Sequence, residues 1–392
     1  MRRSATPAVA AGIVLRTGPA SWRGLPGSAK PRRTHRAQQQ DLMTLPSQPE
    51  RTAPIEALRA VAALAVAAFH FQLDLARALP QTHLPDLIRG AAGVDVFFVI
   101  SGFVIARSAA AATPDHGAGH FAARRLIRIV PLYWSVTLLY LVLAAMLPDR
   151  GNTFTLPMVL ASFAFIPYPR ADGFMQPVIG QGWSLNYEML FYAIYAVAIA
   201  MSRRHASWIA IGALVLVTAL GALPTASPLV EFWTSSIMLE FAAGIVLAEL
   251  YARGWRLSRR LALAGVAAAV AFFLFAPIPP TEFNAGRVLW LGLPSLLLVA
   301  SLALTDRPLI PVWRWVILLG AASYAMYLLM PNRAVIAVMF RLGLDAGNML
   351  VFTTTLAVAL AGTVALSVIV YTFFERPVMR RLQKKLAIIA TR

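Results

Sequence analysis

The chain has 392 residues, of which 59% are hydrophobic and only 13% are charged. This composition excludes a purely soluble fold, because too few polar residues are present to cover one, and it predicts an integral membrane protein surrounded by lipid. The net charge of +18 does not indicate nucleic-acid binding, since the Lys and Arg residues form short clusters between apolar stretches, as cytoplasmic loops do in membrane proteins. The chain has no cysteine, so disulfides, thiol nucleophiles and Cys-based zinc sites are excluded, and no His or carboxylate spacing indicates a metal.

Residues 1–53 are rich in Arg, Pro, Ser and Gln and show no hydrophobic periodicity. Such a segment cannot bury a core, so we predict a disordered basic N-terminal extension. Its apolar run from Ala8 to Leu15 lacks the hydrophobic core and cleavage site of a signal peptide. Translation from Met1 and translation from Met43 are both open.

Within residues 54–378, apolar stretches recur at about 20 residues, the length that spans a bilayer. The predicted spans are 56–75, 91–111, 126–147, 181–201, 206–223, 229–252, 258–277, 286–305, 314–330 and 347–373. The segment 154–168 is shorter and contains Pro157 and Pro167. It is either an eleventh span or an interfacial or re-entrant element.

The loop charges favour the second alternative. If the basic N-terminus is cytoplasmic and 154–168 does not cross, every later arginine cluster and the basic tail 379–392 lie on the cytoplasmic side, as the positive-inside rule requires. If the segment crosses, all these clusters lie on the wrong side. We therefore predict an all-α polytopic protein of about ten transmembrane helices plus one interfacial or re-entrant segment, with both termini cytoplasmic.

The first span contains two ionisable residues, Arg59 and His70, and such residues inside a membrane indicate function because burying them is costly. Eleven steps of about 100° place them on nearly the same helix face, roughly 16 Å apart along the axis. Arg59 then lies near the cytoplasmic edge and His70 nearer the outer leaflet. The alternative is that His70 only forms a structural hydrogen bond.

A carboxylate is predicted at the depth of His70. The helix that begins with WSLNYE at 183–188 enters from the outside, which places Glu188 about 10 Å and His70 about 9 Å below the outer edge of the membrane core. Paired with a carboxylate, an imidazole has a fixed tautomer and suits general-base catalysis. Alternatively, the pair only orients the two helices.

Arg125 and Arg128 lie three residues apart at a helix start, so they share a face at the cytoplasmic edge. With Arg59 they are candidates for binding the phosphates of an anionic donor, since Arg contacts phosphate in a bidentate manner. The alternative for these arginines is anchoring to lipid headgroups. For the adjacent Arg124, this alternative has as much support as a role in donor binding.

Three further polar residues lie inside predicted spans. Asp95 is expected near the outer edge, where it pairs with a basic group or contacts the acceptor. Ser101 is expected at mid-membrane, where it and Gly102 allow close helix approach. Glu240 must face the protein interior, with its role open. These three residues and Tyr324 are candidates for acceptor contact or for a structural role.

These motifs together resemble the acyltransferase family 3 membrane proteins. The resemblance covers about residues 53–383 and rests on Arg59 with His70, on GVDVFF at 93–98 followed by SGF at 101–103, on RRLIRIVP at 124–131, on WSLNYE at 183–188, on SYAMYL at 323–328, which contains Tyr324, and on FERP at 374–377. The segment around Glu188 is most similar to the branch that decorates bacterial exopolysaccharides.

The resemblance implies transfer of an acyl group, often acetyl, from cytoplasmic acyl-coenzyme A to a hydroxyl of a lipid-linked or polymeric envelope glycan. Acyl-coenzyme A is a co-substrate here, and no permanently bound cofactor is expected. Arg59, His70, Arg125 and Arg128 match residues thought functional in that family. Where many members carry His, this chain has Met330, so the catalytic role is expected to fall on His70. Because the chain ends at Arg392, the soluble esterase-like domain of some members is not expected.

A proton-coupled secondary transporter is the main alternative, because His and Glu inside about ten spans also suit proton coupling. Transporters commonly show two related halves, and we find no convincing internal repeat. A non-catalytic scaffold in polysaccharide assembly is a third interpretation.

Overall fold

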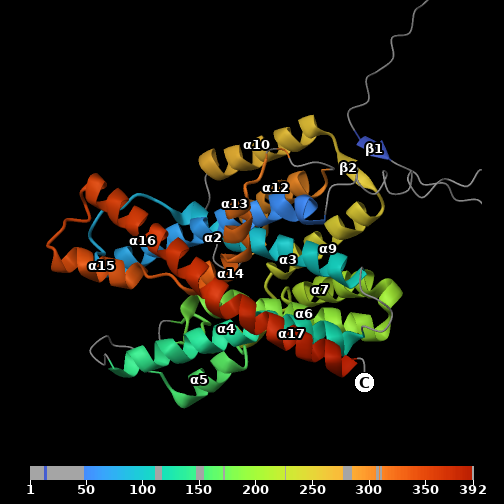
Figure 1. Ribbon diagram of the computed structural model, residues 1–392, viewed down its shortest axis with the longest axis horizontal. Coiled ribbons are helices and arrows are strands. Elements are labelled where there is room, and N and C mark those ends of the chain that lie inside the picture. The colour runs from blue at the N-terminus through green and yellow to red at the C-terminus, as the bar shows by residue number, and fades with distance from the viewer. Residues whose placement is uncertain are drawn as a thin grey trace, which may run out of the picture.

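The computed structural model describes residues 13–15, 48–110, 117–146, 154–170, 173–225, 227–276, 285–305, 309 and 311–390. Most of this part is helical (Figure 1). The elements of the first half are β1 (Ile13–Leu15), α2 (Gln48–Ala78), η1 (Ile88–Ala91), α3 (Ala92–Ala110), α4 (Ala118–Met146), α5 (Leu156–Phe163), η3 (Gly180–Gly182), α6 (Trp183–Met201), η4 (Arg203–His205) and α7 (Ala206–Leu220). Most of the predicted disordered extension 1–53 lies outside the described residues.

The second half continues the helical arrangement. Its elements are α8 (Pro228–Trp233), α9 (Met238–Ala252), β2 (Trp255–Leu257), α10 (Arg259–Phe275), α11 (Ala285–Arg287), η5 (Val288–Gly292), α12 (Leu293–Ala303), α13 (Arg314–Ala321), α14 (Ser323–Leu328), α15 (Asn332–Arg341), α16 (Met349–Val370), η6 (Tyr371–Glu375) and α17 (Arg376–Ala390). The two strands pair antiparallel, with Val14 opposite Arg256.

Six helical stretches in the described part are long and apolar enough to cross a bilayer. They are Ala53–Ala78, Ile88–Ala110, Ala118–Met146, Gly180–Met201, Pro228–Ala252 and Met349–Ile388, and each overlaps one of the ten predicted spans. The other four predicted spans are shorter or interrupted: α7 has 15 residues, α10 has 17, and 288–303 is a shorter apolar helix. The structure therefore supports a helical membrane protein with six such helices, and the predicted count of ten is not confirmed.

The predicted span 314–330 is broken into two short helices, α13 with eight residues and α14 with six. α13 lies against the backbone of α2, because a Cβ atom at Gly320 would come within 2.1 Å of the Glu56 carbonyl oxygen. All six residues of α14 are buried. Only Gly320 of α13 is buried, so the apolar run forms two short helices, of which α14 alone lies in the interior.

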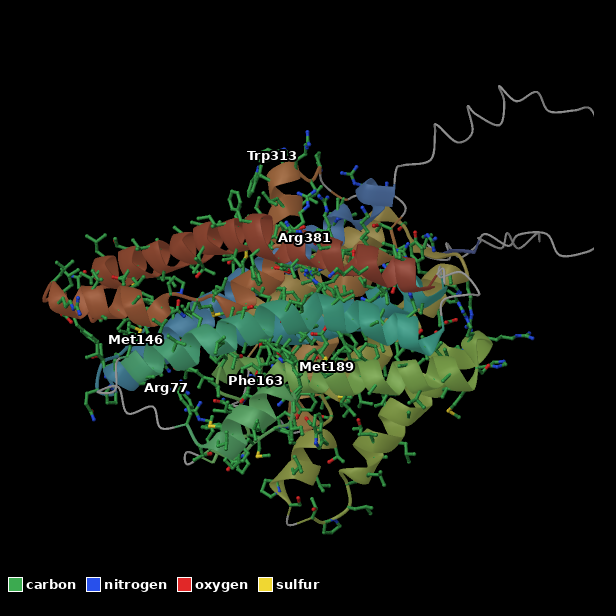
Figure 2. All side chains as sticks on the ribbon, turned by 60° about the horizontal axis from the view of Figure 1, so that its bottom comes forward. Arg77, Met146, Phe163, Met189, Trp313 and Arg381 are labelled. Carbon is green, nitrogen blue, oxygen red and sulfur yellow. The ribbon has the colours of Figure 1, made fainter. Side chains whose placement is uncertain are left out.

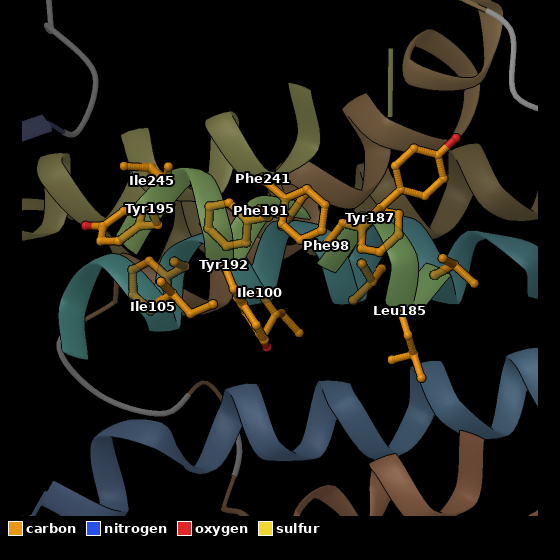
Figure 3. Close-up of a cluster of buried hydrophobic side chains, with 14 of the residues drawn as sticks. Phe98, Ile100, Ile105, Leu185, Tyr187, Phe191, Tyr192, Tyr195, Phe241 and Ile245 are labelled. Atoms are coloured by element: carbon orange, nitrogen blue, oxygen red, sulfur yellow. The ribbon is translucent and has the colours of Figure 1, made fainter. Parts of the chain in front are cut away.

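Helices α3 and α9 form the centre of the molecule. They approach closely through two glycines, since a Cβ at Gly102 would lie 2.2 Å from the Phe241 carbonyl oxygen and a Cβ at Gly244 would lie 2.2 Å from that of Val99. Beside this contact, Phe241 packs on Phe98 and on Phe191 with ring centroids 4.5 Å apart in both pairs (Figure 3). Small residues at a helix contact are typical of packing inside membranes.

Helix α4 lies at the periphery, where it presents an apolar surface. Its exposed large residues are Leu126, Trp134, Leu138, Leu139, Val142, Leu143 and Met146. Figure 2 shows the last of these, Met146, at the same end of the molecule as Arg77, near the end of α2. An apolar face without protein cover is the surface that lipid tails contact.

The segment 154–168 contains α5, a helix of eight residues. Eight residues span about 12 Å, well short of a bilayer core of about 30 Å. Trp134 Nε1 donates a hydrogen bond of 3.0 Å to the Phe163 carbonyl oxygen and so holds α5 against α4. This length fits the predicted interfacial or re-entrant element and not an eleventh span.

Candidate active site

A cavity that is partly open to solvent lies between α2, α3, α4, α6 and α14. Four of the predicted site residues line it with charged groups: Arg59 from α2, Arg125 and Arg128 from α4, and Glu188 from α6. Ser101 and Tyr324 also line it. The tertiary structure thus brings together residues from five helices. Six of these residues had been predicted from the sequence as site residues.

Glu188 is held in the cavity wall by two hydroxyl groups. Ser101 Oγ donates a hydrogen bond of 3.2 Å to Glu188 Oε1, and the Tyr192 hydroxyl donates to the same oxygen. No hydrogen bond within the described part of the chain engages Oε2. In Figure 3, the Tyr192 side chain points towards α2, on the side opposite Phe241. Ser101 was predicted to aid helix approach, and the structure places its hydroxyl on this carboxylate instead.

Arg125 and Arg128 share a helix face, as their spacing predicts, but they have different partners. Arg125 Nη2 donates a hydrogen bond of 2.7 Å to Ser108 Oγ. Arg128 forms an ion pair with Glu375 of η6 and lies over the Tyr324 ring, 5.5 Å from its centroid. The charge of Arg128 is therefore partly offset within the protein.

Arg59 reaches the cavity from the first turns of α2. Its Nη1 lies 3.6 Å from Glu56 Oε1, one turn earlier on the same helix. Its buried Nε has no hydrogen-bond partner among the described residues. A buried donor without a partner is costly unless a ligand or water satisfies it.

His70 lies on the same helix as Arg59 but outside the residues that line this cavity. Its Nδ1 lies 2.9 Å from the Val66 carbonyl oxygen, and since a carbonyl only accepts, Nδ1 carries the proton of this bond. The Nε2 atom is then the acceptor of the neutral ring. Within the described part of the chain no hydrogen bond joins His70 to Glu188, so the expected direct pairing is absent. The predicted equal depth of the two residues is not enough for pairing, because α6 packs mainly on α4 and α7 rather than on α2.

Asp95 and Glu240 belong to a second buried charge cluster, away from the cavity lining. Arg287 donates to both carboxylate oxygens of Asp95, with Nε to Oδ1 at 3.0 Å and Nη2 to Oδ2 at 2.7 Å. Glu240, which is 2% exposed, interacts electrostatically with both residues. Asp95 thus pairs with a basic group, one of its two predicted roles. Sequence analysis missed Arg287, although an arginine inside the predicted span 286–305 was a signal of the same kind as Arg59.

Three hydroxyl groups around the cavity were also not singled out: Tyr192, Ser184 and Tyr327. The Tyr327 hydroxyl donates a hydrogen bond of 2.5 Å to the Gln181 carbonyl oxygen. It therefore accepts the hydrogen bond of 2.6 Å that joins it to Ser184 Oγ. Tyr324 donates 2.8 Å to the Ile129 carbonyl oxygen. These bonds tie α14 to α4 and to the start of α6. Ser184 and Tyr327 lay inside motifs that the sequence analysis had quoted, which was the available signal.

Metal ligation has no candidate in the described part of the chain, where no three His, Asp or Glu side chains gather in a way that would hold an ion. The cavity instead offers guanidinium groups, one carboxylate and several hydroxyls. Guanidinium groups bind phosphate or carboxylate, and a carboxylate or imidazole accepts a proton. The arrangement suits group transfer from an anionic donor to a hydroxyl.

Comparisons with known proteins agree with this chemistry. Residues 53–372 match the model of acyltransferase family 3, whose description is 'acyltransferase domain'. The exopolysaccharide production protein ExoZ of Rhizobium meliloti (strain 1021) is 34% identical over 301 residues, which cover 74% of this chain and 90% of that protein. No solved structure matches the chain significantly. The family match extends over most of the chain and favours the acyltransferase interpretation over the transporter, so this membrane protein belongs to acyltransferase family 3.

Proposed function

We propose that this protein is an O-acyltransferase of the bacterial inner membrane that moves an acyl group, acetyl in the first instance, from cytoplasmic acyl-coenzyme A to a hydroxyl of an exopolysaccharide or related envelope glycan. The observation that carries the proposal is the cavity in which Arg59, Arg125 and Arg128 meet Glu188. The similarity to a protein named for exopolysaccharide production supports the choice of acceptor.

The reaction requires a base near the acceptor hydroxyl. The hydroxyl oxygen attacks the thioester carbonyl carbon, the new C–O bond forms as the C–S bond breaks, the base takes the hydroxyl proton, and the leaving thiolate takes up a proton. We propose His70, which lies on the same helix as Arg59 but outside the residues that line the cavity, as this base, because its Nδ1–H is fixed on the Val66 carbonyl oxygen and Nε2 is left to accept a proton. Glu188 lies in the cavity wall, where its carboxylate positions the reacting groups or assists the proton transfer.

The arginines act on the donor. Arg59 and Arg125 each have a buried Nε without a partner among the described residues, so a ligand that brings oxygen atoms to these positions satisfies them. A low-dielectric cavity strengthens such contacts.

The test is transfer of labelled acetyl from acetyl-coenzyme A into envelope glycans by membranes that contain the wild-type protein, His70→Ala or His83→Ala. His83 is an exposed histidine outside the cavity and serves as the matched control. We expect label with wild type and with His83→Ala, and loss with a normally inserted His70→Ala. Equal label in all three would remove His70 from the mechanism, and no label with wild type, in membranes that contain the glycan, would contradict the proposed donor.

A further inference from the structure

A second cavity, also partly open to solvent, lies beside the first one, between the ends of α3 and α6 and the beginnings of α4 and α7. Its charged and titratable lining residues are His120, Arg124, Arg125, Arg203, Arg204 and Glu249. We refer to it as the basic cavity, and to the cavity around Glu188 as the inner cavity. Arg203 and Arg204 come from η4, a segment that the sequence analysis treated only as a cytoplasmic loop.

The charge of the basic cavity is strongly positive. Four arginines face one glutamate, and that glutamate also lies 3.9 Å from Arg253 on its own helix. In the inner cavity, by contrast, three arginines share their space with Glu188, and Arg128 is paired with Glu375. A ligand with several negative charges is therefore better matched by the basic cavity, because Arg binds phosphate with charge-assisted, bidentate hydrogen bonds.

The basic cavity also has an aromatic wall. Phe121 and Tyr195 both line it, with ring centroids 5.4 Å apart. Arg125 lies over the Phe121 ring, 5.5 Å from its centroid. These rings are largely covered by protein, with Phe121 8% and Tyr195 1% exposed, so they give the cavity an apolar wall rather than a stacking face. Such a wall beside guanidinium groups suits a ligand that carries an apolar ring next to its phosphates, which bind the arginines.

The two cavities meet at Arg125, which lines both. Its hydrogen-bond partner Ser108 lines the basic cavity. On α3, the consecutive residues Ile105 and Ala106 line the inner and the basic cavity, respectively. A long ligand can thus place a charged head in the basic cavity while its other end passes Arg125 into the inner cavity.

We propose that the basic cavity binds the phosphorylated nucleotide part of the acyl donor, with Arg203 and Arg204 as phosphate ligands, and that the acyl-bearing arm extends past Arg125 towards Glu188. This inference rests on the proposed function for the identity of the donor. It differs from the sequence-based expectation, which assigned the phosphates to Arg59, Arg125 and Arg128, because it moves most of the phosphate contacts to η4.

The probe is adenosine 3′,5′-bisphosphate, which carries the nucleotide but no acyl arm. Its binding is measured by calorimetry on the full-length protein in zwitterionic nanodiscs, for wild type, for Arg203→Glu/Arg204→Glu and for Arg380→Glu/Arg381→Glu. The control pair consists of two adjacent exposed arginines of α17 outside both cavities. We expect the first variant to bind at least about tenfold more weakly and the control to bind like wild type.

A neutral variant guards against misfolding. Ala110→Trp narrows the mouth of the basic cavity, where Ala110 is exposed, without changing its charge. We expect it to weaken binding of the bisphosphate as well. Wild-type affinity in both cavity variants, or an equal loss in the α17 control, would overturn the inference.

Two further measurements separate this inference from its alternatives. If the basic cavity holds a lipid headgroup instead, wild type in zwitterionic nanodiscs will not bind the bisphosphate. In addition, Arg203→Glu/Arg204→Glu will lose co-purified anionic lipid while the α17 control keeps it. These results would overturn the inference. If wild type transfers acetyl while Arg203→Glu/Arg204→Glu keeps the wild-type KM for acetyl-coenzyme A, the inference fails and the proposed function stands. If wild type binds the bisphosphate but transfers no acetyl, the nucleotide site in the basic cavity stands and the proposed function fails.

Discussion

Glu188 is the residue whose surroundings say most about the inner cavity. One of its carboxylate oxygens accepts from Ser101 and Tyr192, while the side chain faces a space lined by Arg125. A carboxylate that two hydroxyls hold in one orientation, in a cavity lined by arginines, is positioned to contact a ligand bound there. The neighbouring Asp95–Arg287 pair shows the contrasting case of a buried charge fully engaged by a partner inside the protein.

Glu188→Gln tests the chemical role of this carboxylate, because it keeps the shape and removes the charge. We expect acyl transfer to fall by about 10² or more, with normal membrane insertion and an unchanged Tm. The assay is acetyl transfer from labelled acetyl-coenzyme A, with Glu231→Gln on the exposed part of α8 as the matched control. Transfer at the wild-type rate would leave Glu188 with a structural role only.

Arg287→Met tests the buried ion pair. Removing one partner leaves Asp95 buried and uncompensated, which typically costs about 3–5 kcal/mol, so we expect a large fall in Tm in detergent. Asp95→Asn/Arg287→Met should recover much of that loss. Arg253→Met removes an exposed pair with Glu249, where about 0–1 kcal/mol is expected. Equal Tm values for Arg287→Met and Arg253→Met would contradict this account.

At the scale of elements, the contact between α3 and α9 decides how the inner cavity is built. Both helices carry a glycine where the other backbone approaches, and α3 then presents Ser101 to the cavity on its other side. Close approach also allows the ring of Phe241 to pack between those of Phe98 and Phe191. The packing of α3 therefore fixes the position of a group that binds Glu188.

Gly102→Val tests this contact. The added Cβ would lie 2.2 Å from the Phe241 carbonyl oxygen, and a backbone atom cannot move aside without separating the helices. We expect a Tm lower by several degrees and reduced acyl transfer. Gly212→Val on α7 is the matched control, because no heavy atom lies within 4 Å of its added Cβ. If both variants unfold at the same temperature as wild type, the close approach of α3 and α9 does not govern stability.

At the scale of the whole molecule, the ends of the helices divide into two sets. The ends of α3 and α6 and the beginnings of α4 and α7 meet at the basic cavity. Arg77 and Met146, near the ends of α2 and α4, lie together at the opposite end (Figure 2). The positive-inside rule predicts that the arginine-rich end faces the cytoplasm, the side from which the proposed coenzyme A ester would enter.

The absence of cysteine from the sequence makes this orientation directly measurable. We expect Arg204→Cys to react with a membrane-impermeant maleimide only in inside-out vesicles, because the positive-inside rule predicts that the arginine-rich end faces the cytoplasm. Asp345→Cys, in the exposed turn between α15 and α16, should react in intact spheroplasts. Detergent-permeabilised samples, in which both cysteines are accessible, are the control. Labelling of both positions from one side would overturn the predicted topology.

The sequence by itself determined the class of the protein, its family and the four charged residues that line the inner cavity. Apolar runs of bilayer length and rare ionisable groups within them are local signals, so Arg59, Arg125, Arg128 and Glu188 could be selected without knowing which helices touch. The interruption of 314–330 was not predictable in this way, because composition does not show where a glycine will meet another backbone.

Only the tertiary structure decided which of these groups are neighbours. Depth in the membrane follows from counting residues, but the face that each helix presents and the helices beside it depend on packing across the whole bundle. For that reason His70 and Glu188, which residue counting predicts at a similar depth, share no hydrogen bond, while Arg128 meets Glu375 and Asp95 meets Arg287 across long stretches of sequence. The basic cavity at η4 is likewise a product of packing, because its arginines look like ordinary loop charges until α3, α4, α6, α7 and α9 place them around one space.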